Sequence, residues 1–301
     1  MKHVVGISLG SSTRDHVVTV KLLGEEYKIE RIGTDGNMQK MIEKIREMDG
    51  HVDAFGLGGM DLYIYAVDKR YEIRDARRIV RAAKKSPIVD GSGLKNTLER
   101  RSIEQLAEST TLFEGAPKVL LMSAMDRLGM AQALEKVGCR MTYGDLPYIL
   151  GVPVPLKSLK TLAAIARVLA PIVGQLPFTM IYPTGDKQAV NKPRFTRYFE
   201  ANDIIAGDFH FIHRYMPAEL PGKTIITNTV TTADVEFLRE RGLKTLVTTT
   251  PEMNGRSFGT NVMEALLVCM AGGRGELTEE QYNKLLKELE LEPRVVQLQQ
   301  G

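Results

Sequence analysis

The chain has 301 residues, which is enough for two domains with separate hydrophobic cores. Its 40 basic and 37 acidic residues leave a formal net charge of +3, too small to indicate a nucleic-acid partner. Cys139 and Cys269 lie in apolar segments without the spacing of metal ligands, which favours a reduced, cytoplasmic protein. The N-terminus has the pattern of a short strand, and no apolar run reaches the roughly 18 residues of a membrane span. We therefore expect neither nucleic acid nor a membrane as a partner.

The first part of the chain predicts an α/β region. Short apolar runs that end in glycine or polar residues indicate strands, and apolar residues at helical spacing after Met38 indicate a helix. A break at 114–117, Glu-Gly-Ala-Pro, marks the predicted domain boundary. In chain order the expected elements are strands at 3–9, 17–23 and 26–32, a helix at 38–48, a strand at 53–57, a helix at 74–84, a strand at 86–89 and a helix at 95–108.

The second part alternates strands and helices more regularly, which predicts a parallel sheet with right-handed crossovers. A last helix over 279–289 begins with a capping box from Thr278 to Gln281. The predicted fold class is α/β, with domains at 1–114 and 115–255 and with C-terminal helices at 256–301 that pack back on the first domain. The expected strands of the second sheet lie at 118–123, 140–143, 203–207, 223–227 and 244–249.

Residues 119–146 have the layout of a dinucleotide-binding unit: a strand, a tight turn, a helix, a second strand and an acid. Of the three glycines of a GxxGxxG turn, only the last is present, as Gly129. Ser123 and Asp126 stand where the first two glycines would be. Asp126 would repel a pyrophosphate unless it turns away, and Arg127 would compensate. Asp145 ends the second strand, where an acid binds the ribose of NAD, although it also fits an ordinary turn. The candidate cofactor-binding residues of the turn are Ser123, Ala124, Met125, Asp126, Arg127, Leu128 and Gly129.

Further polar residues follow the later strands of the second sheet. Because ligands bind at the carboxyl ends of parallel strands, Asp208, Asn228, Thr229 and Thr249 are candidate cofactor contacts. His210 lies between Asp208 and His213, but this spacing belongs to no strong metal motif. We therefore predict no metal and keep His210 as a candidate substrate contact, with a surface role as the alternative.

The catalytic candidates lie in the first part of the chain. A lysine beside a carboxylate can relay a proton to or from a hydroxyl group, so Lys95 with Asp90 or Asp61 is the predicted catalytic group. The alternative for 90–97 is a glycine-rich turn before a helix, with a solvated lysine. The predicted substrate contacts are Ser11, Ser12, Asn96 and His210, together with Asn261, which stands one helical turn before Glu264.

The order of these features resembles the shikimate and quinate dehydrogenase group, and more specifically bacterial proteins labelled quinate 5-dehydrogenase, over residues 1 to about 270. The segments that carry the resemblance are 202–207, 220–228, the Lys95 region and 256–265. It implies a substrate domain, then a Rossmann-like domain, then a returning C-terminal helix. The chain departs from that group in its glycine-poor turn and in lacking the Asn-Val-Thr-x-Pro-x-x-Lys motif.

The resulting hypothesis is an oxidoreductase that uses NAD or NADP and transfers hydride to or from a small hydroxylated, quinate-like or shikimate-like substrate, as a homodimer. One alternative is a binding or regulatory protein that keeps the scaffold without chemistry, which the missing glycines favour. A second alternative is a kinase-like enzyme, because residues 7–12 resemble a phosphate loop. That loop has Ser8 where kinases of this type carry a magnesium-binding acid, which weighs against this alternative.

Overall fold

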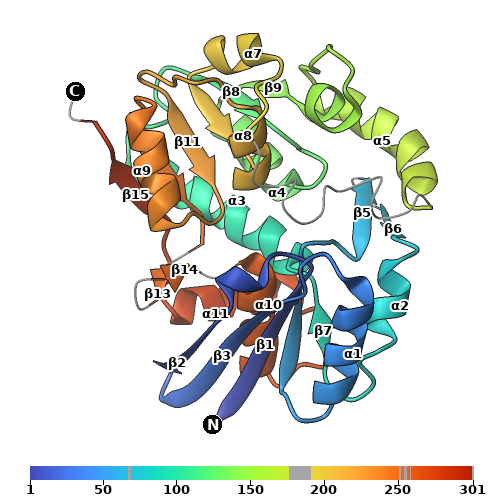
Figure 1. Ribbon diagram of the computed structural model, residues 1–301. Coiled ribbons are helices and arrows are strands. Elements are labelled where there is room, and N and C mark those ends of the chain that lie inside the picture. Colours follow the sequence, from blue (N-terminus) through green and yellow to red (C-terminus); the bar gives the residue numbers. More distant parts are fainter. Residues whose placement is uncertain (67–68, 176–190, 251, 254–255, 258, 300–301) are drawn as a thin grey trace. The chain divides into compact units, whose positions relative to one another are not determined.

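The computed structural model describes residues 1–66, 69–175, 191–250, 252–253, 256–257 and 259–299 (Figure 1). The chain divides into two compact units. The first unit is Met1–Thr97, Val168–Gln188 and Phe258–Leu291, and the second is Leu98–Arg167, Ala189–Ser257 and Glu292–Gly301. The first division falls between Thr97 and Leu98, inside a helix, whereas the sequence predicts a boundary at 114–115.

The first unit is built on a five-stranded sheet in the order β2-β3-β1-β4-β7. Its strands are β1 (Lys2–Ser8), β2 (His16–Leu22), β3 (Glu25–Gly33), β4 (Ala54–Gly58) and β7 (Ile88–Val89). β2 pairs with β3 as an antiparallel hairpin, and all other pairs are parallel. The other elements are the short helix η1 (Ser12–Arg14), helices α1 (Met38–Met48), α2 (Ala76–Val80), α3 (Ser92–Ser109), α10 (Thr260–Met270) and α11 (Glu279–Glu288), and a hairpin of β5 (Tyr63–Ala66) and β6 (Lys69–Glu72).

Alternation along β1 explains the layers of this unit. Val5 and Ile7 belong to the apolar core that includes residues of α1 and α2, whereas Gly6 faces α10. The approach of α10 requires glycine on the sheet, because a Cβ at Gly56 of β4 would lie 2.5 Å from the carbonyl oxygen of Asn261. Helices therefore cover both faces of this sheet (Figure 1).

The second unit has a six-stranded sheet in the order β15-β12-β11-β10-β8-β9. Its strands are β8 (Lys118–Leu121), β9 (Arg140–Tyr143), β10 (Ile204–Ala206), β11 (Thr224–Thr227), β12 (Thr245–Thr248) and β15 (Arg294–Gln297). All pairs are parallel except β12 with β15. The other elements are α4 (Leu128–Lys136), a π-helical turn η2 (Asp145–Leu150), α5 (Leu159–Val173), α7 (Thr196–Glu200), α8 (Phe209–Tyr215), α9 (Thr232–Glu240) and a hairpin of β13 (Glu252–Met253) and β14 (Arg256–Ser257).

The second sheet is buried on both faces. Along β8, Val119 and Leu121 pack in a core with residues of α3 and α4, and Leu120 packs in another with residues of α7 and α8. Strands that are buried on both faces read as continuous apolar runs, which is why the sequence locates them well. The predicted α/β class with parallel sheets is confirmed.

Several local predictions hold, and others need correction. The capping box at Thr278 and Gln281 is present at the start of α11. Helix α2 is much shorter than the predicted 74–84, because the Asp49 carboxylate accepts the backbone N–H groups of 84–86 and draws the chain out of the helix. The sequence did not predict β5 and β6 or the antiparallel strand β15. Among the described residues, no helix is both long and apolar enough to cross a membrane.

Candidate functional site

In the first unit, the predicted catalytic residues lie at the carboxyl edge of the parallel strands. Asp61 follows β4, Asp90 follows β7 directly, and Lys95 lies in the first turns of α3. The ammonium Nζ of Lys95 is 3.7 Å from Oδ1 of Asp61, and the two side chains are only 10% and 17% exposed. Residues that are 34 positions apart in the sequence therefore meet as a shielded ion pair at the edge where α/β sheets bind ligands.

Backbone groups hold the Asp90 carboxylate in place. Its two oxygens accept the N–H of Leu62 at 2.6 Å and the N–H of Ser92 at 2.9 Å. Burial raises the pKa of Asp90, and the neighbouring carboxylate of Asp61 acts in the same direction. The positive charge of Lys95 acts in the opposite direction on Asp90, so the three side chains form one electrostatic cluster.

A second buried acid, Glu264, binds the backbone next to Asp90. Glu264 of α10 is 1% exposed and accepts the N–H of Gly91 at 2.6 Å, while the hydroxyl of Tyr282 in α11 donates to its other oxygen. Burial raises the pKa of Glu264 to about 8. Gly91 has a φ of +94°, and a Cβ there would lie 2.7 Å from the nitrogen of Asn261, so only glycine fits this contact.

The predicted substrate contacts of the first unit lie in the loop after β1 and in the first turns of α3 and α10. Ser11 caps the short helix η1 and Ser12 donates its N–H to Asp35, so both belong to the loop after β1. Asn96 lies in α3, and its side chain donates weakly, at 3.4 Å, to the carbonyl of Ser92. Asn261 begins α10 against the strand ends near Gly58. Their role as substrate contacts stays a prediction.

In the sheet of the second unit, β10 lies beside β8. The chain leaves β8 toward β9 and leaves β10 toward β11, in opposite directions along the sheet. The carboxyl ends of these two strands therefore form a topological switch point, where open α/β sheets bind their ligands. Arg127 from the loop after β8 and Asp208 from the loop after β10 meet across it, with Nη2 and Oδ2 3.0 Å apart. The switch point is therefore bridged by an ion pair of the protein itself.

Acidic and amide groups surround the Arg127 guanidinium. Arg127 is 1% exposed and forms a second ion pair with Glu99 of α3, which is equally buried. The Asp126 carboxylate lies 3.9 Å from its Nε. Asn228, which follows β11, donates its amide to Asp208 at 2.9 Å. Three carboxylates thus lie within 4 Å of one guanidinium.

Asp145 holds the turn that the sequence assigns to a cofactor. Its two carboxylate oxygens accept the N–H groups of Ala124 and Met125, each at 3.0 Å. Burial raises the pKa of Asp145 to about 6, against the opposing effect of these two hydrogen bonds. Both N–H groups belong to the turn that precedes α4, whose first residue is Leu128. The side chain that was expected on a ribose is used here to fix the loop.

The remaining predicted cofactor residues fall into two groups. Ser123, Leu128 and Gly129 surround the loop and the first turn of α4, and Gly129 is buried in the helix packing, as its place in the turn predicts. Thr229 shares a hydrogen bond of 3.1 Å with Thr250, and the Thr249 side chain is 1% exposed. His210 is exposed on α8, and no cluster of metal-ligating residues occurs among the residues that the structure describes.

Acids of the protein occupy the groups that the sequence assigns to a pyrophosphate. The loop N–H groups are bound by Asp145, and the Arg127 guanidinium is bound by Glu99 and Asp208. A pyrophosphate would have to displace these acids, and it would meet the negative charge of Asp126. The cofactor role of this edge stays a prediction.

Two family models match the chain. The model described as "Domain of unknown function (DUF8754)" matches residues 93–298, and the one described as "Domain of unknown function (DUF8753)" matches residues 3–90. The chain belongs to the DUF8754 family. The boundary between the two matches falls at Asp90-Gly91-Ser92-Gly93, the segment that holds Asp90 and starts α3. No curated protein matches the chain.

Solved structures resemble the chain only weakly. A sugar ABC transport system substrate-binding protein from Bordetella parapertussis 12822 has 9% identity and a TM-score of 0.39, over 99% of this chain and 89% of that one. A Mycobacterium smegmatis protein in complex with β-D-fucofuranose has 11% identity and a TM-score of 0.37, over 99% of both chains. The NAD-dependent malic enzyme of Thermotoga maritima has 13% identity and a TM-score of 0.34, over 96% of this chain and 84% of that one. At these TM-scores the similarities carry no conclusion about function.

Sequence reasoning missed two residues of these sites, Glu99 and Tyr282. Glu99 is an acid at a fully buried position of α3, and its partner Arg127 lies 28 residues away. Tyr282 lies in the first turn of the last helix, and its side chain is buried. Glu264 was noted beside Asn261, and its place inside the apolar run of α10 was the signal that it needs a buried partner.

Proposed function

We propose that this protein binds a small hydroxylated metabolite at the carboxyl edge of the first sheet and exchanges a proton with it through Lys95. The observation that supports this function is the shielded pair of Lys95 and Asp61 beside the backbone-held Asp90. A lysine that is paired with a carboxylate and mostly removed from water is suited to give a proton to a hydroxyl oxygen or to take one from it.

The charge balance of the cluster favours hydroxyl groups in the ligand. Asp61 and Asp90 offer acceptor oxygens that sugar-like or cyclic hydroxyls satisfy well, and Lys95 pairs with Asp61. A carboxylate on the ligand would add another negative charge beside these two carboxyl groups. We therefore expect a neutral cyclic polyol to bind better than quinate or shikimate.

Thermal unfolding of the full chain with myo-inositol, shikimate and quinate tests this proposal, because a ligand that binds only the folded state raises the melting temperature. We expect the largest shift with myo-inositol and the loss of that shift in Lys95→Met and Asp61→Asn. Lys84→Met, which removes an exposed lysine of the same unit, is the matched control and should keep it. A shift that survives in both site variants would refute the site.

A nicotinamide-dependent dehydrogenase is the second candidate, and the strand order of the second sheet favours it. Read without β15, the order β12-β11-β10-β8-β9 is that of a Rossmann-like sheet that lacks one edge strand, and Asp145 follows β9 where the ribose acid stands. This function requires Asp208 and Asp145 to release Arg127 and the loop. Saturable binding of NAD or NADP that weakens in Asp145→Ala would establish it. The homodimer and the cytoplasmic location stay predictions from the sequence.

A further inference from the structure

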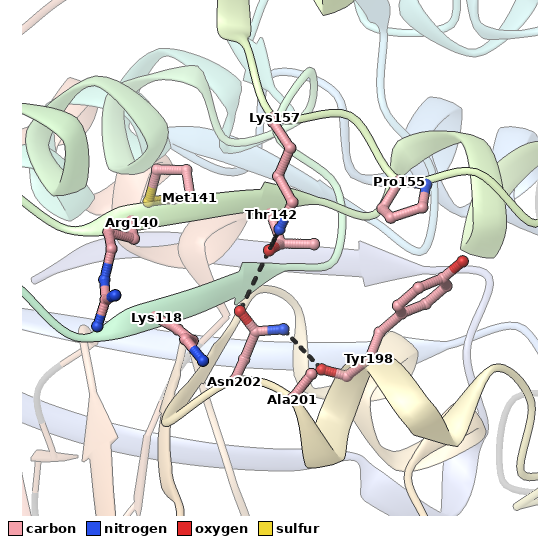
Figure 2. A pocket seen from close by; sticks show the side chains of 9 residues that line it. All are labelled: Lys118, Arg140, Met141, Thr142, Pro155, Lys157, Tyr198, Ala201 and Asn202. Atoms are coloured by element: carbon pink, nitrogen blue, oxygen red, sulfur yellow. Dashed lines mark hydrogen bonds between the residues drawn. The ribbon is translucent and has the colours of Figure 1, made fainter.

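The second unit contains a pocket of about 410 Å³ at the amino-terminal ends of β8 and β9 (Figure 2). It lies at the opposite end of these strands from the loops that hold Asp145 and Arg127, so it belongs to neither edge described above. Its size is that of a pocket for a small metabolite. The lining residues are Lys118, Arg140, Met141, Thr142, Pro155, Lys157, Tyr198, Ala201 and Asn202.

Three cationic side chains line this pocket, from Lys118, Arg140 and Lys157. Arg140 uses its Nε to donate to the carbonyl of Ala116 at 2.8 Å, which leaves both terminal nitrogens of the guanidinium for other partners. Asp203 accepts the backbone N–H of Lys118 at 2.8 Å. Among the described residues, no carboxylate lies within 4.0 Å of a charged nitrogen of these three side chains. The lining therefore has three positive charges and no acid.

A chain of hydrogen bonds fixes the floor of the pocket. Lys157 donates to the hydroxyl oxygen of Thr142 at 2.5 Å, and that hydroxyl donates to Oδ1 of Asn202 at 3.2 Å. Asn202 in turn donates its amide to the carbonyl of Tyr198 at 2.7 Å. Figure 2 shows Lys157 and Asn202 meeting Thr142 from opposite sides. Thr142 and Asn202 are only 2% and 3% exposed, so this relay holds the ammonium of Lys157 in one place without neutralising its charge.

The walls of the pocket are mainly apolar. Pro155, Ala201 and the ring of Tyr198 line the pocket beside the polar floor. Pockets for small molecules typically combine such walls with a few oriented polar groups, which supply the specificity. A ligand that matches this pocket has an apolar ring or chain for the walls and a compact negative group for the cations.

We propose that this pocket binds a small organic anion, an oxyanion of the phosphate or carboxylate type carried on an apolar ring. Arg140 and Lys157 hold the oxyanion with charge-assisted hydrogen bonds, Lys118 adds long-range attraction, and Tyr198 packs on the ring. The site is independent of the polyol proposed for the first unit, because none of its residues lies there.

Calorimetric titration of the full chain with phenyl phosphate and with benzoate tests the site, with benzamide as the neutral analogue. We expect saturable binding of at least one anion, and the tighter of the two identifies the oxyanion. Loss of a charge-assisted hydrogen bond should weaken that binding by about tenfold or more in Arg140→Gln and in Lys157→Gln. Lys160→Gln removes an exposed lysine three positions from Lys157 and should leave the affinity unchanged.

Three results would overturn the proposal. Binding of benzamide as tight as that of benzoate would show that the negative charge contributes nothing. Wild-type affinity in both site variants would place the anion elsewhere. A lack of binding of both anions at millimolar concentration would leave the three cations as ordinary solvated side chains. Because Arg140 and Lys157 are both exposed, the variants should fold like the wild type, and their melting temperatures without ligand check this.

Discussion

Each unit has a basic side chain among acids at the carboxyl edge of its sheet, but the two clusters differ in burial. At the carboxyl edge of the first sheet, Lys95 is shared by Asp61 and Asp90 and keeps some access to solvent. At the carboxyl edge of the second sheet, Arg127 is completely buried between Glu99 and Asp208. The carboxyl edge of each sheet is thus a position where a ligand can bind, but the side chains there decide whether a ligand has access to it.

The two cations also differ in kind. The Arg127 guanidinium stays charged in its buried place and holds acids of the protein together, whereas the Lys95 ammonium is the group that we propose to exchange a proton with a ligand.

Replacing Arg127 should cause the largest loss of stability. Arg127→Met leaves the buried Glu99 carboxylate without its cation, and breaking a buried ion pair in this way costs about 3–5 kcal/mol. Guanidinium denaturation measures the change in the free energy of unfolding. Lys136→Met removes an exposed pair with Glu104 and should cost less than about 1 kcal/mol. Equal losses in the two variants would show that Arg127 is no structural bridge.

Removing the Asp145 carboxylate should have a smaller effect on the same edge. Asp145→Ala deprives the N–H groups of Ala124 and Met125 of their acceptor, and an unsatisfied buried donor costs about 1–3 kcal/mol. Faster amide hydrogen exchange at 124 and 125 should accompany the loss. Unchanged exchange at both positions would contradict the role of Asp145 as a clamp on the loop.

Glu264 should give the first unit a pH-dependent stability. Its pKa of about 8 when folded lies above that of the unfolded chain, so the folded state holds an extra proton between roughly pH 4.5 and pH 8. Stability from this group is complete below that window and falls as pH rises through it, by up to about 1.4 kcal/mol per pH unit. Glu264→Gln keeps a neutral group and should flatten this slope in denaturation curves measured from pH 5 to pH 9. An identical slope in the variant would place the titration elsewhere.

Tyr282→Phe should have the smallest effect. It removes one hydrogen bond to Glu264, which is worth about 0.5–1.5 kcal/mol. Because that bond lowers the pKa of Glu264, the variant should continue to lose stability above pH 8, where the wild type levels off. Comparing the two unfolding curves at pH 7 and pH 9 measures this difference. A constant difference between the two proteins at both pH values would contradict it.

The sequence predicts the strands and their polar ends better than the contacts between them. Apolar runs such as 119–122 locate β8, and the polar residues that follow β4 and β7 locate Asp61 and Asp90 at one edge. The partners of Arg127 depend on three-dimensional folding that brings Glu99 and Asp208 to the same place from distant segments. The short β15 and the early end of α2 also depend on tertiary contacts, which residue patterns do not encode.

The missing glycines of the 123–129 turn have a physical explanation in this structure. Glycines serve to let a pyrophosphate approach the backbone, and here Asp145 and the Arg127 network occupy that space. The sequence signals that the turn is unusual, but it does not reveal that acids of the protein bind the turn and Arg127.

Calorimetric titration of the full chain with NAD, NADH, NADP and NADPH tests most directly whether the two edges differ in use. Our account predicts no saturable binding of any of the four to the wild type, because Asp208 and Asp145 already hold the groups that would bind the pyrophosphate. Saturable binding of one nucleotide, weakened in Asp145→Ala and unaffected in Lys84→Met, would contradict it and would make the second edge the cofactor site of a dehydrogenase.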